Sequence, residues 1–251
     1  MQNTYQQQVS GAEWQARCEL AALYRLLAFY RMTDLIDTHI SLRVPDEPNH
    51  FLINHYGVTF DQMKASDLVK IDGDGRIVSD LDQHKQVNPA GFVIHSALHA
   101  ARADLHCVVH THTADGVAVS AQQAGLLPIS QHALKFYGKL SYHPYEGIAL
   151  ATDERARLVA DMGQNKAMIL ANHGLLAAGE TVYEAFNQIY FLERACQIQT
   201  KALAGGQPLI YPSEAVCQKT AAQHLEGHEA YVKQCWDAAV ALLDQTQDYG
   251  R

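Results

Sequence analysis

The sequence predicts an α/β fold in which helices cover one central sheet, either mixed or antiparallel. Two observations support this prediction. The chain has 251 residues, 48% of them hydrophobic, with no break in composition, which favours one large domain over two small ones. Its helical and strand-like patterns follow the order helix, strands, alternating strands and helices, then helices. That order is typical of a sheet packed against helices.

The N-terminal third is expected to form a helix and then short strands. Residues 11–32 carry apolar side chains at helical spacing, which predicts an amphipathic helix. Residues 39–44 and 51–54 are strand-like runs separated by a turn-rich segment, so we expect a hairpin. Asp74-Gly75 lies between apolar runs and predicts a second hairpin.

The rest of the chain alternates between the two patterns before it becomes helical. Helical spacing of apolar residues predicts the helices, and short β-branched or apolar runs predict the strands. The predicted helices span 92–103, 116–124, 155–162 and 182–203, the predicted strands span 105–110 and 167–170, and residues 213–246 are expected to form one or two helices.

Composition argues against several classes of partner. The net charge of −8 disfavours binding to nucleic acid. No segment approaches the ~20 unbroken apolar residues of a membrane span, and residues 1–10 lack the apolar core of a signal peptide. The five cysteines are widely spaced without a Cys-x-x-Cys pair, which is typical of reduced thiols. We therefore expect a cytoplasmic protein that binds neither nucleic acid nor a membrane.

Histidines carry the most specific chemical signal. The chain contains 14 of them, roughly twice the ordinary usage. The β-branched run Val108-Val109 ends in His110-Thr111-His112. Alternate residues of a strand point the same way, so both imidazoles can face one divalent ion such as zinc. The competing interpretation is two unrelated polar residues at a strand end.

His173 is a candidate for a third ligand. It follows a second apolar run, 169–171, and precedes Gly174, which allows a sharp turn or a close approach of the backbone. Considered alone, His173 is better explained as a structural residue. Together with His110 and His112 it predicts a three-histidine site with open coordination positions, as catalytic metals have.

These motifs resemble those of the class II aldolase/adducin family. The resemblance rests on residues 108–112 and 171–174, and it extends from about residue 18 to 203 of a single domain spanning 1–251, with 204–251 as a helical extension. It implies an α/β/α fold around a mostly antiparallel sheet. It also implies a homotetramer with sites at subunit boundaries, and Zn²⁺ as the metal, with Mn²⁺ or Fe²⁺ as alternatives.

The sequence departs from the aldolases of this family at their catalytic and phosphate-binding positions. Those enzymes carry Pro-Ser-Ser-Glu upstream of His-x-His, with serines that bind phosphate and a glutamate that transfers protons. The corresponding segment here is Asn88-Pro89-Ala90-Gly91, so Gly91 stands in the place of the glutamate. The resemblance therefore supports the metal more firmly than it supports cleavage of a sugar phosphate.

Two further family motifs are also altered. His39 replaces the asparagine of a Gly-Asn-(Ile/Leu)-Ser motif in which Ser41 is kept, and Gly57 is kept from a Thr-Pro-(Ser/Thr)-Gly turn that now contains Tyr56. From the resemblance we assign substrate binding to His39, Ser41, Tyr56 and Gly57.

Proton transfer beside a metal-polarised carbonyl needs a replacement for the missing carboxylate. His132 lies near the position where family aldolases place a catalytic tyrosine from a neighbouring subunit, and Tyr145 follows in the same region. We expect catalytic roles for both, although Tyr145 also fits aromatic packing at a subunit interface. The other candidate bases are His39, His55, Tyr56 and His95, of which His95 is better explained by helix packing.

The expected function is that of a metal-dependent lyase acting on a small oxygenated carbonyl compound or oxo acid. The altered phosphate positions argue against a simple sugar phosphate. Three alternatives stay open: decarboxylation at the same site, iron-dependent oxygen chemistry at the same site, and a non-enzymatic, adducin-like interaction module.

Overall fold

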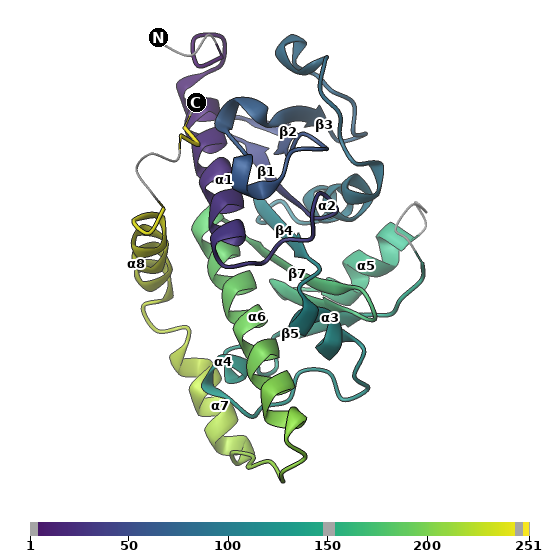
Figure 1. The fold of residues 1–251 in the computed structure, drawn as a ribbon, viewed down its shortest axis with the longest axis vertical. Helices are drawn as coiled ribbons and strands as arrows, with labels where there is room; N and C mark the ends of the chain where they lie inside the picture. Colours follow the sequence, from purple (N-terminus) through teal and green to yellow (C-terminus); the bar gives the residue numbers. More distant parts are fainter. Residues whose placement is uncertain (1–4, 148–153, 244–247, 251) are drawn as a thin grey trace.

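The structure is a computed structural model that describes residues 5–147, 154–243 and 248–250. It has a central sheet with helices on both faces, so the α/β/α arrangement predicted from the sequence is confirmed (Figure 1). Within the described ranges, no helix is long and apolar enough to cross a membrane.

The sheet contains seven strands among the described residues, in the order β3-β2-β1-β4-β7-β6-β5. The strands are β1 (His39–Val44), β2 (Glu47–Ile53), β3 (Val69–Asp72), β4 (Cys107–Thr111), β5 (Leu140–His143), β6 (Ala167–Leu170) and β7 (Gly174–Gly179). Every neighbouring pair is antiparallel except β5 and β6, which run parallel. The predicted mostly antiparallel sheet is therefore confirmed.

Two long helices lie on one face of the sheet and two shorter ones on the other. The first face is covered by α1 (Gly11–Phe29) and α6 (Val182–Ala204), and the second by α2 (Pro89–Ala101) and α5 (Glu154–Met162). The remaining helices are α3 (Ala114–Ser120), α4 (Gln131–Leu134), α7 (Glu214–Gln223) and α8 (His228–Val240).

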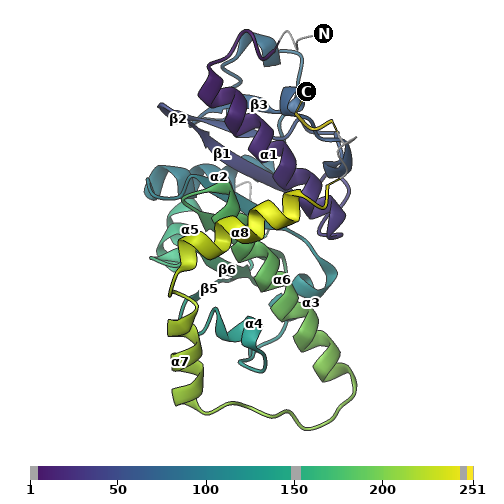
Figure 2. The same ribbon diagram turned by 90° about the vertical axis from the view of Figure 1, so that its left-hand side faces the viewer.

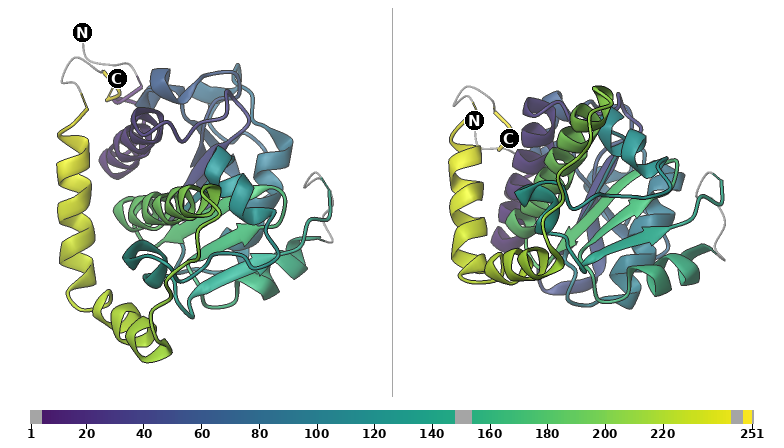
Figure 3. Two further views of the ribbon diagram at one scale, coloured as in Figure 1. Left: turned by 60° about the horizontal axis from the view of Figure 1, so that its bottom comes forward. Right: turned by 90° about the horizontal axis from the view of Figure 1, so that it is seen from below.

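Alternation of side chains along the strands gives the sheet a core on each face. Val109 on β4 packs with the α1 and α6 side, whereas its neighbour Val108 packs with the α2 and α5 side. Helix α8 lies outside α6 (Figures 2 and 3). Between the two helices, Trp236 contacts Phe186 with ring centroids 5.9 Å apart. Helix α8 therefore adds a further layer outside α1 and α6, and α7 contacts α4.

The structure differs from the sequence-based prediction most clearly at β7, which was not predicted. Residues 174–179 read Gly-Leu-Leu-Ala-Ala-Gly, and glycine and alanine have low strand propensity. All six residues are nonetheless buried, and the strand pairs with β4 on one side and β6 on the other. Pairing with two neighbours outweighs the weak local preference here.

The short elements α4 and β5 were not predicted either, and several further differences concern boundaries. The first helix was expected to reach residue 32 but ends at Phe29, because Arg31 adopts a left-handed backbone with φ of 58°. The predicted hairpin around Asp74-Gly75 turns as expected, but its second arm is reduced to a single bridge from Ile71 to Ile77. The predicted C-terminal helical region forms two helices, and its last residues, 244–246, lie outside the described residues.

Candidate metal centre

Three imidazole nitrogens converge at the end of β4. The Nε2 atom of His110 lies 2.8 Å from that of His112 and 3.2 Å from that of His173, and the latter two are 3.0 Å apart. A tetrahedral ion bonded to imidazole nitrogens at about 2.0–2.1 Å would hold such nitrogens about 3.3 Å apart. The three predicted ligands are thus already close to the spacing that a divalent ion requires.

The strand topology explains why residues 61 and 63 positions apart meet here. Antiparallel pairing sets Thr111 at the end of β4 opposite Leu175 at the start of β7. His112 follows β4 and His173 precedes β7, so the two rings share one edge of the sheet. Gly174 permits this approach, because a Cβ atom at this position would lie 2.3 Å from the carbonyl oxygen of Thr111.

Hydrogen bonds on the far side of two rings orient them towards the common point. His110 donates from Nδ1 to the carbonyl oxygen of Leu175 at 2.9 Å, which leaves its Nε2 as the nitrogen able to bind a metal. Nδ1 of His112 lies 3.2 Å from the carboxylate of Asp34. Such carboxylate partners fix ring orientation and strengthen the ligand. No local pattern marks Asp34 in the sequence, and the prediction missed it.

Burial keeps two of the three rings, those of His110 and His173, in the neutral form that binds metals. Burial, followed by the neighbouring rings of His39, His173 and His112, holds the pKa of His110 well below its ordinary value. Burial, followed by His112, lowers the pKa of His173 to about 4. His110 and His173 are therefore neutral, and a set of three imidazole donors fits Zn²⁺, Mn²⁺ or Fe²⁺.

The open side of the cluster faces a cavity of about 360 Å³. Tyr145, one of the predicted catalytic residues, lies at its rim with its ring centroid 6.4 Å from that of His173. The full lining is Asp34, Asp37, His39, Asn88, Ile94, His110, His112, Tyr145, Gly147 and His173. None of these described lining residues is a lysine or arginine, so the cavity offers no side-chain cation to a phosphate group.

The four predicted substrate-binding residues fall into two groups. His39 lines the cavity, and its ring centroid lies 5.2 Å from that of His110. Ser41 is buried behind His39, where it contacts His95 and His99 instead of the cavity. Tyr56 and Gly57 lie in the turn after β2 and are not among the residues that line the cavity.

His39 also explains the glycine that stands in the place of the family glutamate. A Cβ atom at Gly91 would lie 2.3 Å from Cδ2 of His39 and 2.6 Å from its Nε2. A glutamate at this position therefore cannot coexist with His39 in its present place. The two substitutions, one at 39 and one at 91, are sterically linked.

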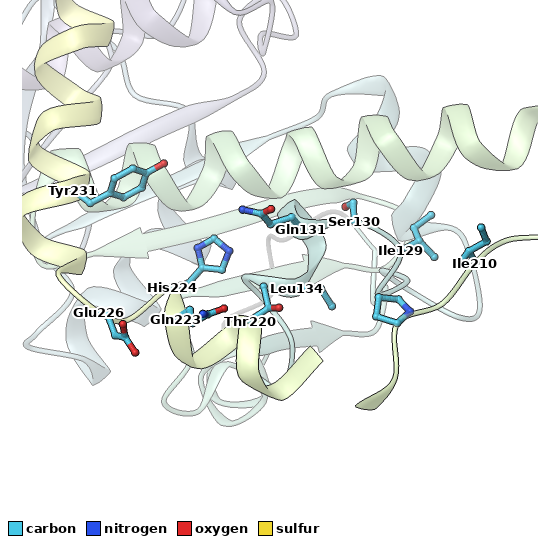
Figure 4. Close-up of a pocket in the computed structure, with 11 residues that line it drawn as sticks. Ile129, Ser130, Gln131, Leu134, Ile210, Thr220, Gln223, His224, Glu226 and Tyr231 are labelled. Atoms are coloured by element: carbon cyan, nitrogen blue, oxygen red, sulfur yellow. The ribbon is translucent and has the colours of Figure 1, made fainter. Parts of the chain in front are cut away.

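His132 is not brought to the metal cluster within this chain. It belongs to α4, where its ring lies 5.7 Å from that of Phe191 on α6, measured between centroids. Beside it lies a larger cavity of about 850 Å³ between α4 and the C-terminal segment (Figure 4). Its lining includes Gln131, Thr220 and His224 but no group of metal-ligating side chains among the described residues. A catalytic role for His132 therefore requires a second subunit.

Comparison with known proteins identifies the family of the chain. Residues 18–200 match the family model described as the class II aldolase and adducin N-terminal domain. A protein of Caulobacter vibrioides named "Putative aldolase class 2 protein" is 53% identical over 199 residues, covering 79% of this chain and 77% of the relative. Alpha-adducin of Rattus norvegicus is 46% identical over 189 residues, which cover 75% of this chain but 26% of the adducin.

Solved structures give the same result for the fold. An aldolase II superfamily protein from Pseudomonas syringae superposes with a TM-score of 0.95 at 50% identity, covering 99% of this chain and 100% of the other. L-fuculose 1-phosphate aldolase from Glaciozyma antarctica superposes with a TM-score of 0.82 at 27% identity, covering 94% and 92%. The chain belongs to the class II aldolase and adducin family.

Proposed function

We propose that this protein is a metal-dependent lyase that cleaves or forms a carbon–carbon bond next to the carbonyl group of a small oxygenated substrate or oxo acid. The observation that carries the proposal is the convergence of three Nε2 atoms, from His110, His112 and His173, at the wall of an accessible cavity. Three histidines with an open side are typical of catalytic metal sites. Zn²⁺ is the proposed ion, with Mn²⁺ or Fe²⁺ as alternatives.

The residues around the cavity would have separate roles in binding the ion and the substrate. When bound by the three histidines, the ion would polarise a carbonyl group and stabilise the developing oxyanion. Tyr145 at the rim and His39 on the wall offer hydrogen-bonding groups to the substrate. Asp34 holds His112 in place from behind.

The charge of the residues that line the cavity limits the class of substrate that it can bind. Asp34 and Asp37 give it acidic side chains, and the described lining holds no lysine or arginine. A phosphate dianion would be poorly accommodated there, since phosphate sites rely on cationic or backbone donors. We propose a substrate that reaches the metal through its own carbonyl, hydroxyl or carboxylate oxygens.

A second candidate is a non-enzymatic interaction module like the adducin head. It is favoured by the greater identity to alpha-adducin, 46%, than to L-fuculose 1-phosphate aldolase, 27%, and by the absent glutamate at Gly91. The metal cluster favours the enzyme, because an interaction module has no evident need for three ligands that open onto a cavity.

We further propose a cytoplasmic homotetramer. All five cysteines are free, which suits a reducing compartment. Large apolar side chains are exposed along the C-terminal part, including Ile210, Tyr211 and Leu225, and this exposure favours burial against another subunit. Association would also offer a route for His132 to approach a neighbouring metal site. Light scattering that gives the mass of a single chain would contradict this assembly.

The lyase is tested by presenting the zinc-, manganese- and iron-loaded protein with aldehyde–ketone donor pairs and with oxo acids. We expect carbon–carbon bond cleavage or formation that disappears on chelation and in the His173→Ala variant. Oxygen consumption with iron but not with zinc would support oxygen chemistry instead. Absence of turnover with every metal across the panel would contradict the lyase and favour the interaction module.

A further inference from the structure

A continuous chain of hydrogen bonds leads from the backbone just before β4 to the wall of the metal cavity. Nδ1 of His99 lies 3.1 Å from the carbonyl oxygen of Leu105, and Nε2 of the same ring lies 2.7 Å from Oγ of Ser41. The Ser41 oxygen lies 2.5 Å from Nδ1 of His95, whose Nε2 lies 2.7 Å from Nδ1 of His39. The chain thus ends on a ring that lines the cavity.

All four side chains in this chain are shielded from solvent. Ser41, His95, His99 and His39 are between 1% and 4% exposed. Burial, ahead of nearby His and Arg groups, lowers the pKa of His99 to about 3 and that of His95 well below its ordinary value. Both rings are therefore neutral at neutral pH, and each has one N–H and one acceptor nitrogen.

The direction of every bond follows from the backbone end. A carbonyl oxygen only accepts, so Nδ1 of His99 carries the hydrogen and its Nε2 must accept from the Ser41 hydroxyl. The Ser41 oxygen has then used its hydrogen and must accept from Nδ1–H of His95. Nε2 of His95 is left as an acceptor, so the hydrogen of the last bond belongs to Nδ1 of His39.

This direction determines what His39 presents to the cavity. With its hydrogen on Nδ1, the neutral ring of His39 has an unprotonated Nε2, and this atom makes no other hydrogen bond within the described residues. Gly91 leaves the room that the ring occupies, since a Cβ atom there would lie 2.6 Å from Nε2. The ring of His39, with its acceptor nitrogen, therefore occupies space that any side chain at position 91 would enter.

We propose that the His99–Ser41–His95 chain is a positioning device that locks His39 in its Nδ1–H tautomer, so that Nε2 accepts a hydrogen bond from a hydroxyl group of the substrate. The ligand class is a 2-hydroxy carbonyl compound, whose carbonyl oxygen faces the metal while the neighbouring hydroxyl donates to His39. The substrate part of this inference rests on the proposed function, whereas the tautomer part does not.

The tautomers are measured by two-bond ¹H–¹⁵N correlation spectra of the zinc-loaded protein with ¹⁵N-labelled histidine. We expect His39, His95 and His99 to carry hydrogen on Nδ1, which is the minor form of free histidine in water. Individual His→Gln variants assign the signals. Hydrogen on Nε2 of His39, or a doubly protonated His39 ring at neutral pH, would overturn the proposal.

Substitution of Ser41, the middle residue of the hydrogen-bond chain, distinguishes a positioning role from a purely structural one. In Ser41→Ala, we expect His99 to keep its Nδ1–H bond to the Leu105 carbonyl, while His95 and His39 become mixtures of tautomers. The control is Ser96→Ala on the same helix as His95, because the Ser96 hydroxyl contacts the carbonyl oxygen of Val93 in its own helix. Zinc content should stay unchanged in both variants. An unaltered His39 tautomer in Ser41→Ala would contradict the chain.

The ligand class is tested by titrating the zinc-loaded protein with hydroxyacetone and with acetone. One hydrogen bond contributes about 0.5–1.5 kcal/mol, so we expect hydroxyacetone to bind about 2- to 12-fold more tightly. Ser41→Ala and His39→Phe should abolish this preference, and Ser96→Ala should keep it. Equal binding of the two probes, or binding of neither, would overturn the role of His39 in substrate positioning. Locked tautomers without turnover would contradict the lyase while leaving the positioning device intact.

Discussion

At the scale of single residues, Asp34 connects the geometry of the site to metal affinity. Its carboxylate lies 3.2 Å from Nδ1 of His112. Loss of such a partner typically costs 10- to 100-fold in metal affinity, so we expect Asp34→Asn to weaken zinc binding by about that factor in competition with a chelator. Asp37→Asn is the matched control, because Asp37 lines the same cavity without a hydrogen bond to a ligand histidine among the described residues. Equal weakening in both variants would indicate a loss of charge instead of a loss of orientation.

Gly91 gives a second prediction at this scale. A methyl group at this position would lie 2.3 Å from Cδ2 of His39, so Gly91→Ala must displace that ring. We expect a loss of about 1–3 kcal/mol in the free energy of unfolding, as for other overpacked sites, measured by urea denaturation. Gly205→Ala is the control, since nothing lies within 4 Å of the added atom there. If His39→Ala failed to relieve the cost of Gly91→Ala, the steric link would be wrong.

The sequence revealed these residues unevenly. His110, His112 and His173 were predictable because each stands at the end of an apolar strand-like run, and strand alternation aims two of them together. Asp34 was not, since it acts from a turn that no periodicity describes. His95 was expected to serve helix packing, and only the packing of α2 against β1 shows that it bonds to His39 and Ser41.

At the scale of elements, helices and strands with a strong local sequence pattern were predictable. Strands that depend on pairing with their neighbours were not. The long helix α6 and the strand β6 agree with their predicted ranges within one residue, because their apolar spacing is continuous. Strand β7 was not predicted, because its glycine and alanine residues favour strands only weakly. They form a buried strand through pairing with β4 and β6. The two predicted hairpins differ in outcome: β1 and β2 pair along most of their length, whereas the second arm of the Asp74-Gly75 hairpin makes a single bridge to β3.

A buried ionic network ties α1 to the segment around β3. The fully buried guanidinium of Arg17 contacts Glu13 at 2.9 Å, the Leu68 carbonyl at 2.8 Å and Asp82 at 3.5 Å. Arg17→Met would leave the carboxylates of Glu13 and Asp82 with one lysine each, Lys70 and Lys85, so we expect the free energy of unfolding to fall by about 3 kcal/mol, the lower end of the cost of breaking a buried pair. The exposed Arg76 forms an ion pair with Asp74 at the surface, and Arg76→Met should cost less than about 1 kcal/mol. Similar costs in urea denaturation would show that the buried network is not stabilising.

At the scale of the whole molecule, buried histidines predict sensitivity to acid. The pKa values of His99 and His173 are lowered to about 3 and about 4, mainly by burial, and His39, His95 and His110 are lowered well below the ordinary value of 6.5. The unfolded chain therefore binds more protons than the folded one as the pH falls below about 6.5. Stability is present above that pH and is lost as the pH falls towards the folded-state values.

The expected size of this effect is measurable. For each histidine that stays neutral when folded, lowering the pH from 7.5 to 5.5 removes about 1.4 kcal/mol from the free energy of unfolding. We expect metal-free protein to lose several times this amount in urea denaturation, and His99→Gln to show a shallower dependence on pH. Stability that is constant or rises on acidification would contradict the burial of neutral rings.

The central claim, that His110, His112 and His173 form a metal centre, is tested most directly by elemental analysis of the protein equilibrated with zinc and passed through a desalting column. We predict about one ion per chain in the natural sequence and loss of that ion in His112→Ala/His173→Ala, with the fold retained in circular dichroism. The control His50→Ala/His55→Ala, which removes two histidines outside the cluster, should keep the ion. Natural protein that retains no zinc, manganese or iron, or a His112→Ala/His173→Ala variant that retains as much metal as the control, would contradict the account.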